Sequence, residues 1–142
     1  MRGWAQRLDQ SRVRSRADKT ELQPLPKAIR DALSLEYHLQ LEALRAGAGS
    51  LTALRILLRV AMAAALLREL GYGGRRLHTA DEYERIAGNA YESGEVGRYG
   101  FDPAAFLTFS ALVTDHDLQL EIAPVRVIDI VARQLERPSA AQ

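Results

Sequence analysis

The chain has 142 residues, of which 47% are hydrophobic and 26% are charged, with a net charge of +1 and no cysteine. This length fits one domain around a single core, and the composition excludes a disordered chain. Without cysteine there is no disulfide, thiolate metal site or cysteine nucleophile, and a reducing compartment fits that absence. Residues 1–16 lack the apolar run of a signal peptide, and no charge-free run reaches the ~20 residues that span a bilayer. We therefore expect a cytoplasmic protein that does not enter the membrane.

The small net charge hides an uneven distribution. Residues 1–30 hold eight Lys or Arg and three Asp or Glu, a net charge of +5, whereas residues 31–142 hold eleven and fifteen, a net charge of −4. We therefore predict a basic arm at residues 1–25, a helical domain at 26–137 and a tail at 138–142. The arm could be a solvated tail, or it could bind nucleic-acid phosphates or an acidic partner. The cationic residues that would make such contacts are Arg2, Arg7, Arg12, Arg14, Arg16 and Lys19.

Helical periodicity predicts a first helix from Pro26 or Lys27 to Ala46. Leu35 and Leu39 form a second apolar strip, so we expect this helix to be buried on two sides. The main strip recurs at spacings of four, four and three and consists of Leu33, Tyr37, Leu41 and Leu44.

The second predicted helix covers residues 51–70 and begins after Ser50, a good N-cap residue. It is apolar around most of its circumference, apart from a narrow strip that includes Arg55 and Arg59. This pattern is typical of the central helix of a bundle. Glycines from Gly71 onward end it.

Three further helices follow. Thr79 and Glu82 form a capping-box pattern at the start of a helix that runs to about Ser93. Asp102 followed by proline opens a helix that ends near residue 119 or 121, and Pro124 opens the last one. We therefore predict an all-α fold, a helical bundle of about five helices with a basic, poorly structured N-terminal arm. The predicted inward-facing residues of the third and last helices are Tyr83, Ile86, Ala87, Ala90 and Tyr91, and Val127, Ile128, Val131 and Leu135.

The segment "TDHDLQLE" at residues 114–121 concentrates polar residues on the helix that begins after Asp102. His116 falls in the middle of the helix's apolar stripe, Asp117 and Gln119 fall at its edges, and Asp115 points away. The pattern predicts a core histidine held by one hydrogen bond to a neighbouring helix. The alternatives are a catalytic acid or base and a polar hub that lines a binding groove. The residues of such a hub are His38, His116, Asp117, Gln119 and Glu121.

The chain carries no recognisable catalytic pattern. His38 and Glu42 stand four residues apart, which indicates a surface pair on one helix rather than a metal site. The sequence has neither the Glu-x-x-His pairs of di-iron bundles nor an H-E-x-x-H motif. It also lacks a phosphate-binding loop after a predicted strand, and no serine stands in a nucleophile elbow. We predict that the protein is not an enzyme and has no cofactor or metal.

Two segments together, "SLEYHLQLEALRAGAGS" and "HDLQLEIAPVRVIDIVARQLE", resemble a family of uncharacterised small helical proteins with basic N-terminal arms. Members occur in proteobacterial phages and integrated mobile elements. The resemblance covers about residues 33–135 and implies an accessory or regulatory protein that acts on host machinery, without implying an activity. The matching residues are His38, Leu39, Leu44, Gly47 and Gly49, then His116, Asp117, Gln119, Leu120 and Glu121.

Two functions follow from these observations. The first is a non-enzymatic regulatory or accessory protein that binds a protein partner through apolar residues on the helices at 27–46 and 51–70, which a homodimer interface could also cover. The alternative is a protein that binds DNA or RNA through its basic arm. An exposed apolar patch on the folded domain favours the first function, and a basic stripe continuous with the arm favours the second.

Overall fold

The structure is a computed structural model that describes residues 19–74 and 78–137. The described residues form no strand, and residues 19–21 are helical. This confirms the predicted all-α class. Of the predicted arm contacts, Lys19 is described and exposed, whereas Arg2, Arg7, Arg12, Arg14 and Arg16 lie outside the described residues. The helices are α2 (Lys27–Arg45), α3 (Leu51–Glu69), α4 (Ala80–Ser93), α5 (Pro103–Ile122) and α6 (Val125–Glu136).

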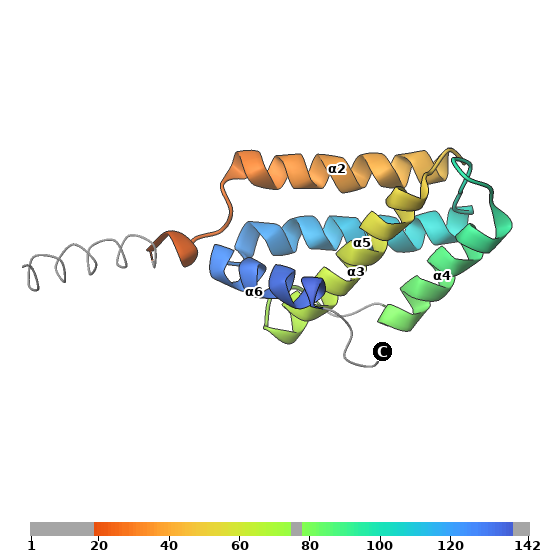
Figure 1. Ribbon diagram of the computed structural model, residues 1–142. Coiled ribbons are helices and arrows are strands. Elements are labelled where there is room, and N and C mark those ends of the chain that lie inside the picture. The colour runs from red at the N-terminus through yellow and green to blue at the C-terminus, as the bar shows by residue number, and fades with distance from the viewer. Residues whose placement is uncertain (1–18, 75–77, 138–142) are drawn as a thin grey trace, which may run out of the picture.

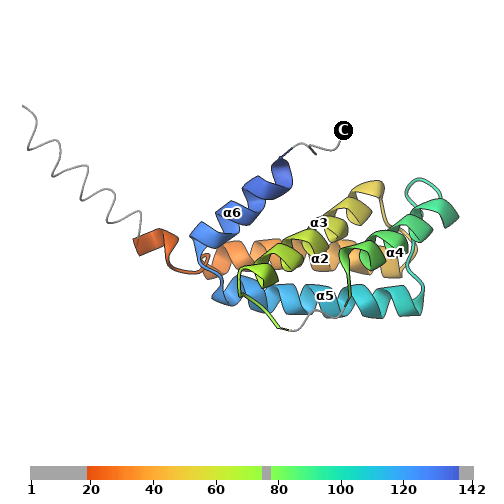
Figure 2. The ribbon, with the colours of Figure 1, turned by 90° about the horizontal axis from the view of Figure 1, so that it is seen from below.

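Helix α3 is the centre of the bundle, because it packs against α2, α4, α5 and α6. Figures 1 and 2 show α2 and α5 side by side and antiparallel, with α3 crossing them and α4 and α6 on opposite sides of α3. The predicted central position of the helix at 51–70 is therefore confirmed.

Local sequence signals set the helix starts. The side chains of Ser50, Thr79 and Asp102 each accept a hydrogen bond from the backbone N–H three residues on, as N-caps do. Pro124 precedes α6, and the Val125 N–H donates to the Gln23 carbonyl at 2.8 Å. The end of the predicted arm is thus bonded to the start of the last helix.

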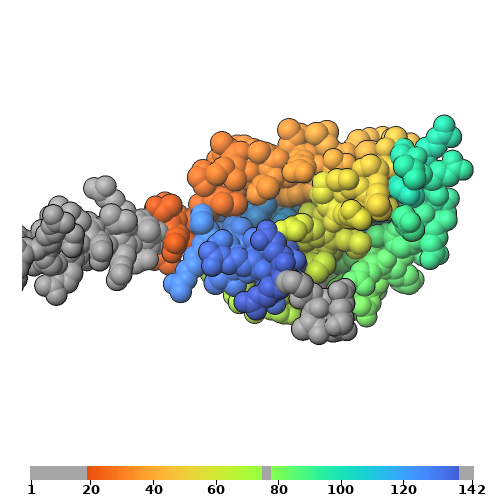
Figure 3. All heavy atoms as spheres, viewed as in Figure 1, coloured from red at the N-terminus to blue at the C-terminus, as the bar shows by residue number. Residues whose placement is uncertain are grey.

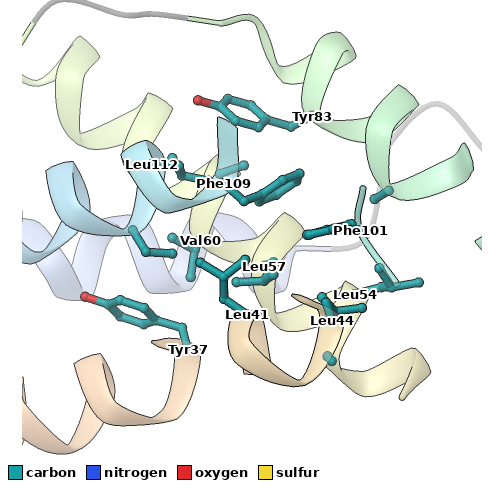
Figure 4. Close-up of a cluster of buried hydrophobic side chains, with 14 of the residues drawn as sticks. Tyr37, Leu41, Leu44, Leu54, Leu57, Val60, Tyr83, Phe101, Phe109 and Leu112 are labelled. Carbon is teal, nitrogen blue, oxygen red and sulfur yellow. The ribbon is translucent and has the colours of Figure 1, made fainter. Parts of the chain in front are cut away.

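The main core lies where α2, α3, α4 and α5 meet. Figure 4 shows aliphatic side chains at its middle and Tyr37 and Tyr83 at opposite margins. Two members come from the segment between α4 and α5 that the sequence predicts only as a loop: Tyr99 and Phe101 are both buried. The Phe101 ring stacks on Phe109 with centroids 4.8 Å apart.

A glycine contact holds this loop to the turn between α2 and α3. Gly49 and Tyr99 exchange two backbone hydrogen bonds, of 2.9 and 3.1 Å. A Cβ on Gly49 would overlap the Leu44 side chain and lie 3.0 Å from the Tyr99 carbonyl oxygen, so a larger residue would push the loop away from the turn. Glycine is required here for close approach rather than for its backbone angles.

The predicted second buried strip of the first helix is wrong. Leu35 is 60% exposed and Leu39 is 58% exposed, because α3 and α5 both pack on the side of α2 that holds Tyr37 and Leu41. Tyr91 was predicted to face inward and is half-exposed, with its ring stacked on Tyr99 at the margin of the core. The other predicted inward-facing residues of α4 and α6 are buried or partly buried.

Candidate functional site

A polar cluster joins α2 to α5 around Asp117. The Tyr37 hydroxyl donates to Asp117 Oδ1, and His38 Nε2 lies 2.8 Å from Asp117 Oδ2. The side chains of His38 and Asp117 are partly exposed, whereas Tyr37 is buried. The predicted pair of His38 with Glu42 is wrong, because His38 turns to α5 and Glu42 pairs with Arg45.

These contacts shift the pKa values of Tyr37 and Asp117 in opposite directions. Burial raises the pKa of the Tyr37 hydroxyl, and the neighbouring Asp117 carboxylate raises it further, so this tyrosine stays protonated. Burial alone would raise the pKa of Asp117, but hydrogen bonds from Tyr37, Ser34 and His38 outweigh it and lower the pKa. Asp117 is therefore an anion at neutral pH.

A second cluster lies deeper, between α5 and α3. His116 is buried and its Nδ1 lies 2.8 Å from Gln119 Oε1. Gln119 Nε2 donates to the backbone carbonyls of Ala64 and Tyr72, both at 3.0 Å. The predicted core histidine is confirmed, but its predicted partner is wrong: the hydrogen bond goes to its own helix, and Gln119 makes the connection to α3. Gln119, predicted at the edge of the stripe, is fully buried.

The hydrogen bonds of Gln119 fix the tautomer of His116. Because the Gln119 amide nitrogen faces two carbonyl oxygens, its Oε1 must face His116 and can only accept a hydrogen bond. The Nδ1 atom of His116 is therefore the donor, and its Nε2 carries a lone pair when the ring is neutral. Burial lowers the pKa of His116, which favours the neutral ring.

Tyr37 connects the two clusters. Its ring centroid lies 5.3 Å from that of His38 and 5.6 Å from that of His116. Tyr37 was predicted only as a core residue, although a tyrosine in a buried stripe needs a partner for its hydroxyl. Of the predicted hub, the structure brings together His38, His116, Asp117 and Gln119, whereas Glu121 is exposed at the surface.

Asp115, predicted to point away from the bundle, instead forms an ion pair with Arg68 of α3. Both side chains are largely buried, at 23% and 11% exposure. Three successive polar residues of α5, Asp115, His116 and Asp117, thus bond to other helices or to buried groups. These bonds fix the orientation of α5 about its axis relative to α2 and α3.

Helix α5 is also apolar on the side away from the core. Leu107 is 67% exposed, and Leu118 and Ile122 are each 56% exposed. At about 100° per residue, these three positions fall on one side of the helix, with the exposed Ala111 between them. We call these four residues the outer face of α5.

The burial of neutral His116 predicts a pH-dependent stability. A histidine whose folded pKa is depressed binds protons more readily in the unfolded chain, so stability falls as pH drops below the ordinary value of about 6.5. We expect the free energy of unfolding of the wild type, relative to His116→Phe, to fall by at most about 1.4 kcal/mol per pH unit between pH 6.5 and 5. Urea unfolding at several pH values measures this, and the difference between the two proteins cancels other titrating groups. A difference that does not vary with pH would contradict it.

Further observations bound the site. In residues 19–74 and 78–137, no group of three or more His, Cys, Asp or Glu is placed to hold a metal ion. No helix within the same ranges is long and apolar enough to cross a membrane. Comparisons of the chain with protein family models, curated proteins and solved structures give no match.

Proposed function

We propose that this protein is a cytoplasmic, non-enzymatic regulatory protein that binds another protein through the outer face of α5. The single observation that carries the proposal is the exposure of Leu107, Leu118 and Ile122 on one side of a long helix. Exposed leucines are common singly, but an aligned apolar face is typical of an interaction surface. On the neighbouring helix α2, Leu35 and Leu39 are also exposed.

The chemistry of this face indicates its partner. The four residues of the outer face are uncharged, and exposed Thr114 and Glu121 border them on the same helix, so we expect a partner to cover this face mainly with apolar side chains. The predicted apolar excess on the helix at 51–70 contributes less, because most of α3 is buried in the core. A context in a phage or mobile element, with action on host machinery, stays a prediction from the sequence.

Replacing Leu107 and Leu118 together by serine tests the surface. Each leucine buried in an interface contributes about 1.5–3 kcal/mol, so partner affinity should fall at least about tenfold. Tagged wild type and variant are used to capture proteins from a lysate of the expressing cells, and the captured proteins are quantified by mass spectrometry. At least one should be retained by the wild type and lost by the variant.

Val96→Ser is the matched control, because this side chain is 90% exposed in the loop after α4 and lies off the outer face. It should retain the same captured proteins as the wild type. Circular dichroism and thermal unfolding check that both variants fold, and sedimentation velocity shows whether the partner is a second copy of the chain. Equal capture by all three proteins would refute the proposal.

Nucleic-acid binding through the arm stays a prediction, because its arginines lie outside the described residues. Among the basic residues that follow Lys19, Lys27 pairs with Asp31 and Arg30 donates to the Leu25 carbonyl. The two basic residues that follow the arm in the sequence thus already have partners within the domain. The described surface therefore adds no support to nucleic-acid binding.

A further inference from the structure

A groove of about 340 Å³ lies between α2, α3, α5 and α6. In Figure 3, α2, α3 and α6 meet on the face turned to the viewer. Sites for small molecules are typically about 300–1,000 Å³ and mostly apolar, with a few polar groups that orient the ligand. The groove has that size, and most of its lining is aliphatic, with Leu33, Val60, Leu120, Ile128, Val131 and Leu135 among its residues.

Four lining residues carry polar groups, and three of them are engaged or solvated. Glu36 and Arg59 are exposed and of opposite sign, and Arg59 lies 3.7 Å from Glu136. The Tyr37 hydroxyl donates to Asp117. The fourth is His116, which is only 7% exposed. The groove therefore offers a ligand no strong net charge and one buried polar ring.

His116 presents an acceptor to that ligand. Its Nδ1–H donates to Gln119 Oε1, so Nε2 carries the lone pair. Among the described residues, this bond to Gln119 is the only hydrogen bond of the ring. Among the described residues, Nε2 is not one of the fully buried atoms that lack a partner, so it keeps contact with solvent, and a ligand that donates to it takes the place of water there. An ordinary apolar groove would not discriminate between donors and acceptors, whereas this one should.

We propose that the groove binds a small, uncharged, mainly apolar ring compound that donates one hydrogen bond, from N–H or O–H, to His116 Nε2. The proposal is independent of the partner-binding face. His116 lies on the core side of α5, whereas Leu107 and Leu118 lie on the outer side of the same helix. Either surface could therefore fail its test without affecting the other.

Indole and benzofuran are the probes that test this. They have nearly the same shape, but indole donates through its N–H while the benzofuran oxygen can only accept. A net hydrogen bond contributes about 0.5–1.5 kcal/mol, so indole should bind about 2- to 12-fold more tightly to the full-length wild type, as measured by isothermal titration calorimetry. Equal affinities, or no binding of either probe, would overturn the proposal and leave the groove to a peptide or a second copy.

Two variants separate the acceptor from the groove. His116→Phe keeps a planar ring without the acceptor, so the preference for indole should vanish while benzofuran binding remains. Ala63→Trp fills the groove from α3 and should abolish binding of both probes. A preference for indole that survives His116→Phe would overturn the assignment of the acceptor.

Long-range ¹H–¹⁵N spectra of the wild-type histidines test the same contact without any substitution. The unbound protein should show His116 as the Nδ1–H tautomer, and indole but not benzofuran should shift the Nε2 resonance as it gains a hydrogen bond. This keeps the proposal testable if His116→Phe does not fold. The same Nε2 shift with both probes, or the opposite tautomer, would refute the proposal.

Discussion

Replacing Gln119 by leucine should destabilise the protein by about 3–5 kcal/mol, although the substitution makes the core more apolar. The Gln119 side chain is fully buried and bonds three groups: the Ala64 and Tyr72 carbonyls and His116 Nδ1. Leucine has a similar volume but satisfies none of them. A buried polar group left without its hydrogen bond costs about 1–3 kcal/mol, so three of them outweigh the gain from an added apolar side chain.

Urea denaturation followed by circular dichroism measures this effect. The control is Gln134→Leu on α6, where the same chemical change occurs at an exposed position and should alter stability by less than about 0.5 kcal/mol. Similar stabilities for Gln119→Leu and the control would show that the buried hydrogen bonds contribute little, and would weaken the tautomer assigned to His116.

The Gln119 bonds also explain why the polar hub could be predicted only in part. That His116 lies inward follows from its place in the apolar stripe, because a helix has a fixed period. Which group it contacts depends on the turn after α3, where Tyr72 supplies a carbonyl. A Cβ on Gly73 would come within 2.6 Å of Gln119 Nε2, so the turn approaches closely only because glycine stands there. No periodicity within α5 contains this information.

The same distinction applies to the fold. The starts of α3, α4 and α5 could be predicted because Ser50, Thr79 and Asp102 cap the helix that each precedes. The exposure of Leu35 and Leu39 could not be predicted, because an apolar strip has the same pattern whether the domain or a partner covers it. The wrong prediction is informative, since apolar side chains that the domain leaves exposed are those available to a partner.

The orientation of α5 about its own axis links the polar clusters to the outer face. Asp117 bonds to α2, Asp115 pairs with Arg68 of α3, and Gln119 bonds to carbonyls of α3 and the turn after it. With three sides of the helix held in this way, the remaining side, which carries Leu107 and Leu118, must face outward. A helix that is apolar all round would otherwise have no unique orientation. We infer that these polar contacts specify which apolar face is buried and which is presented.

Phe109→Ala should destabilise the protein by about 3–5 kcal/mol, because it leaves a cavity where α5 meets α4 and the loop that follows it. Phe109 has no exposed surface and packs edge-on against Tyr83, with ring centroids 5.3 Å apart. The Phe101 ring stacks on the ring of Phe109. Without this ring, Phe101 and the backbone pairing of Tyr99 with Gly49 lose their support, so the loop should loosen with the core.

Leu107→Ala is the matched control for Phe109→Ala, because Leu107 lies two residues away on the same helix but is largely exposed. It should change the free energy of unfolding by less than about 0.5 kcal/mol. Guanidinium denaturation gives both values, and hydrogen exchange at Tyr99 and Phe101 shows whether the loop opens at lower free energy. If Leu107→Ala destabilised the protein as strongly as Phe109→Ala, the side of α5 that we assign to a partner would instead be part of the protein's own core. A small effect there and a large one at Phe109 would mean that Leu107 does not contribute to folding, and that its exposed apolar surface is available for binding.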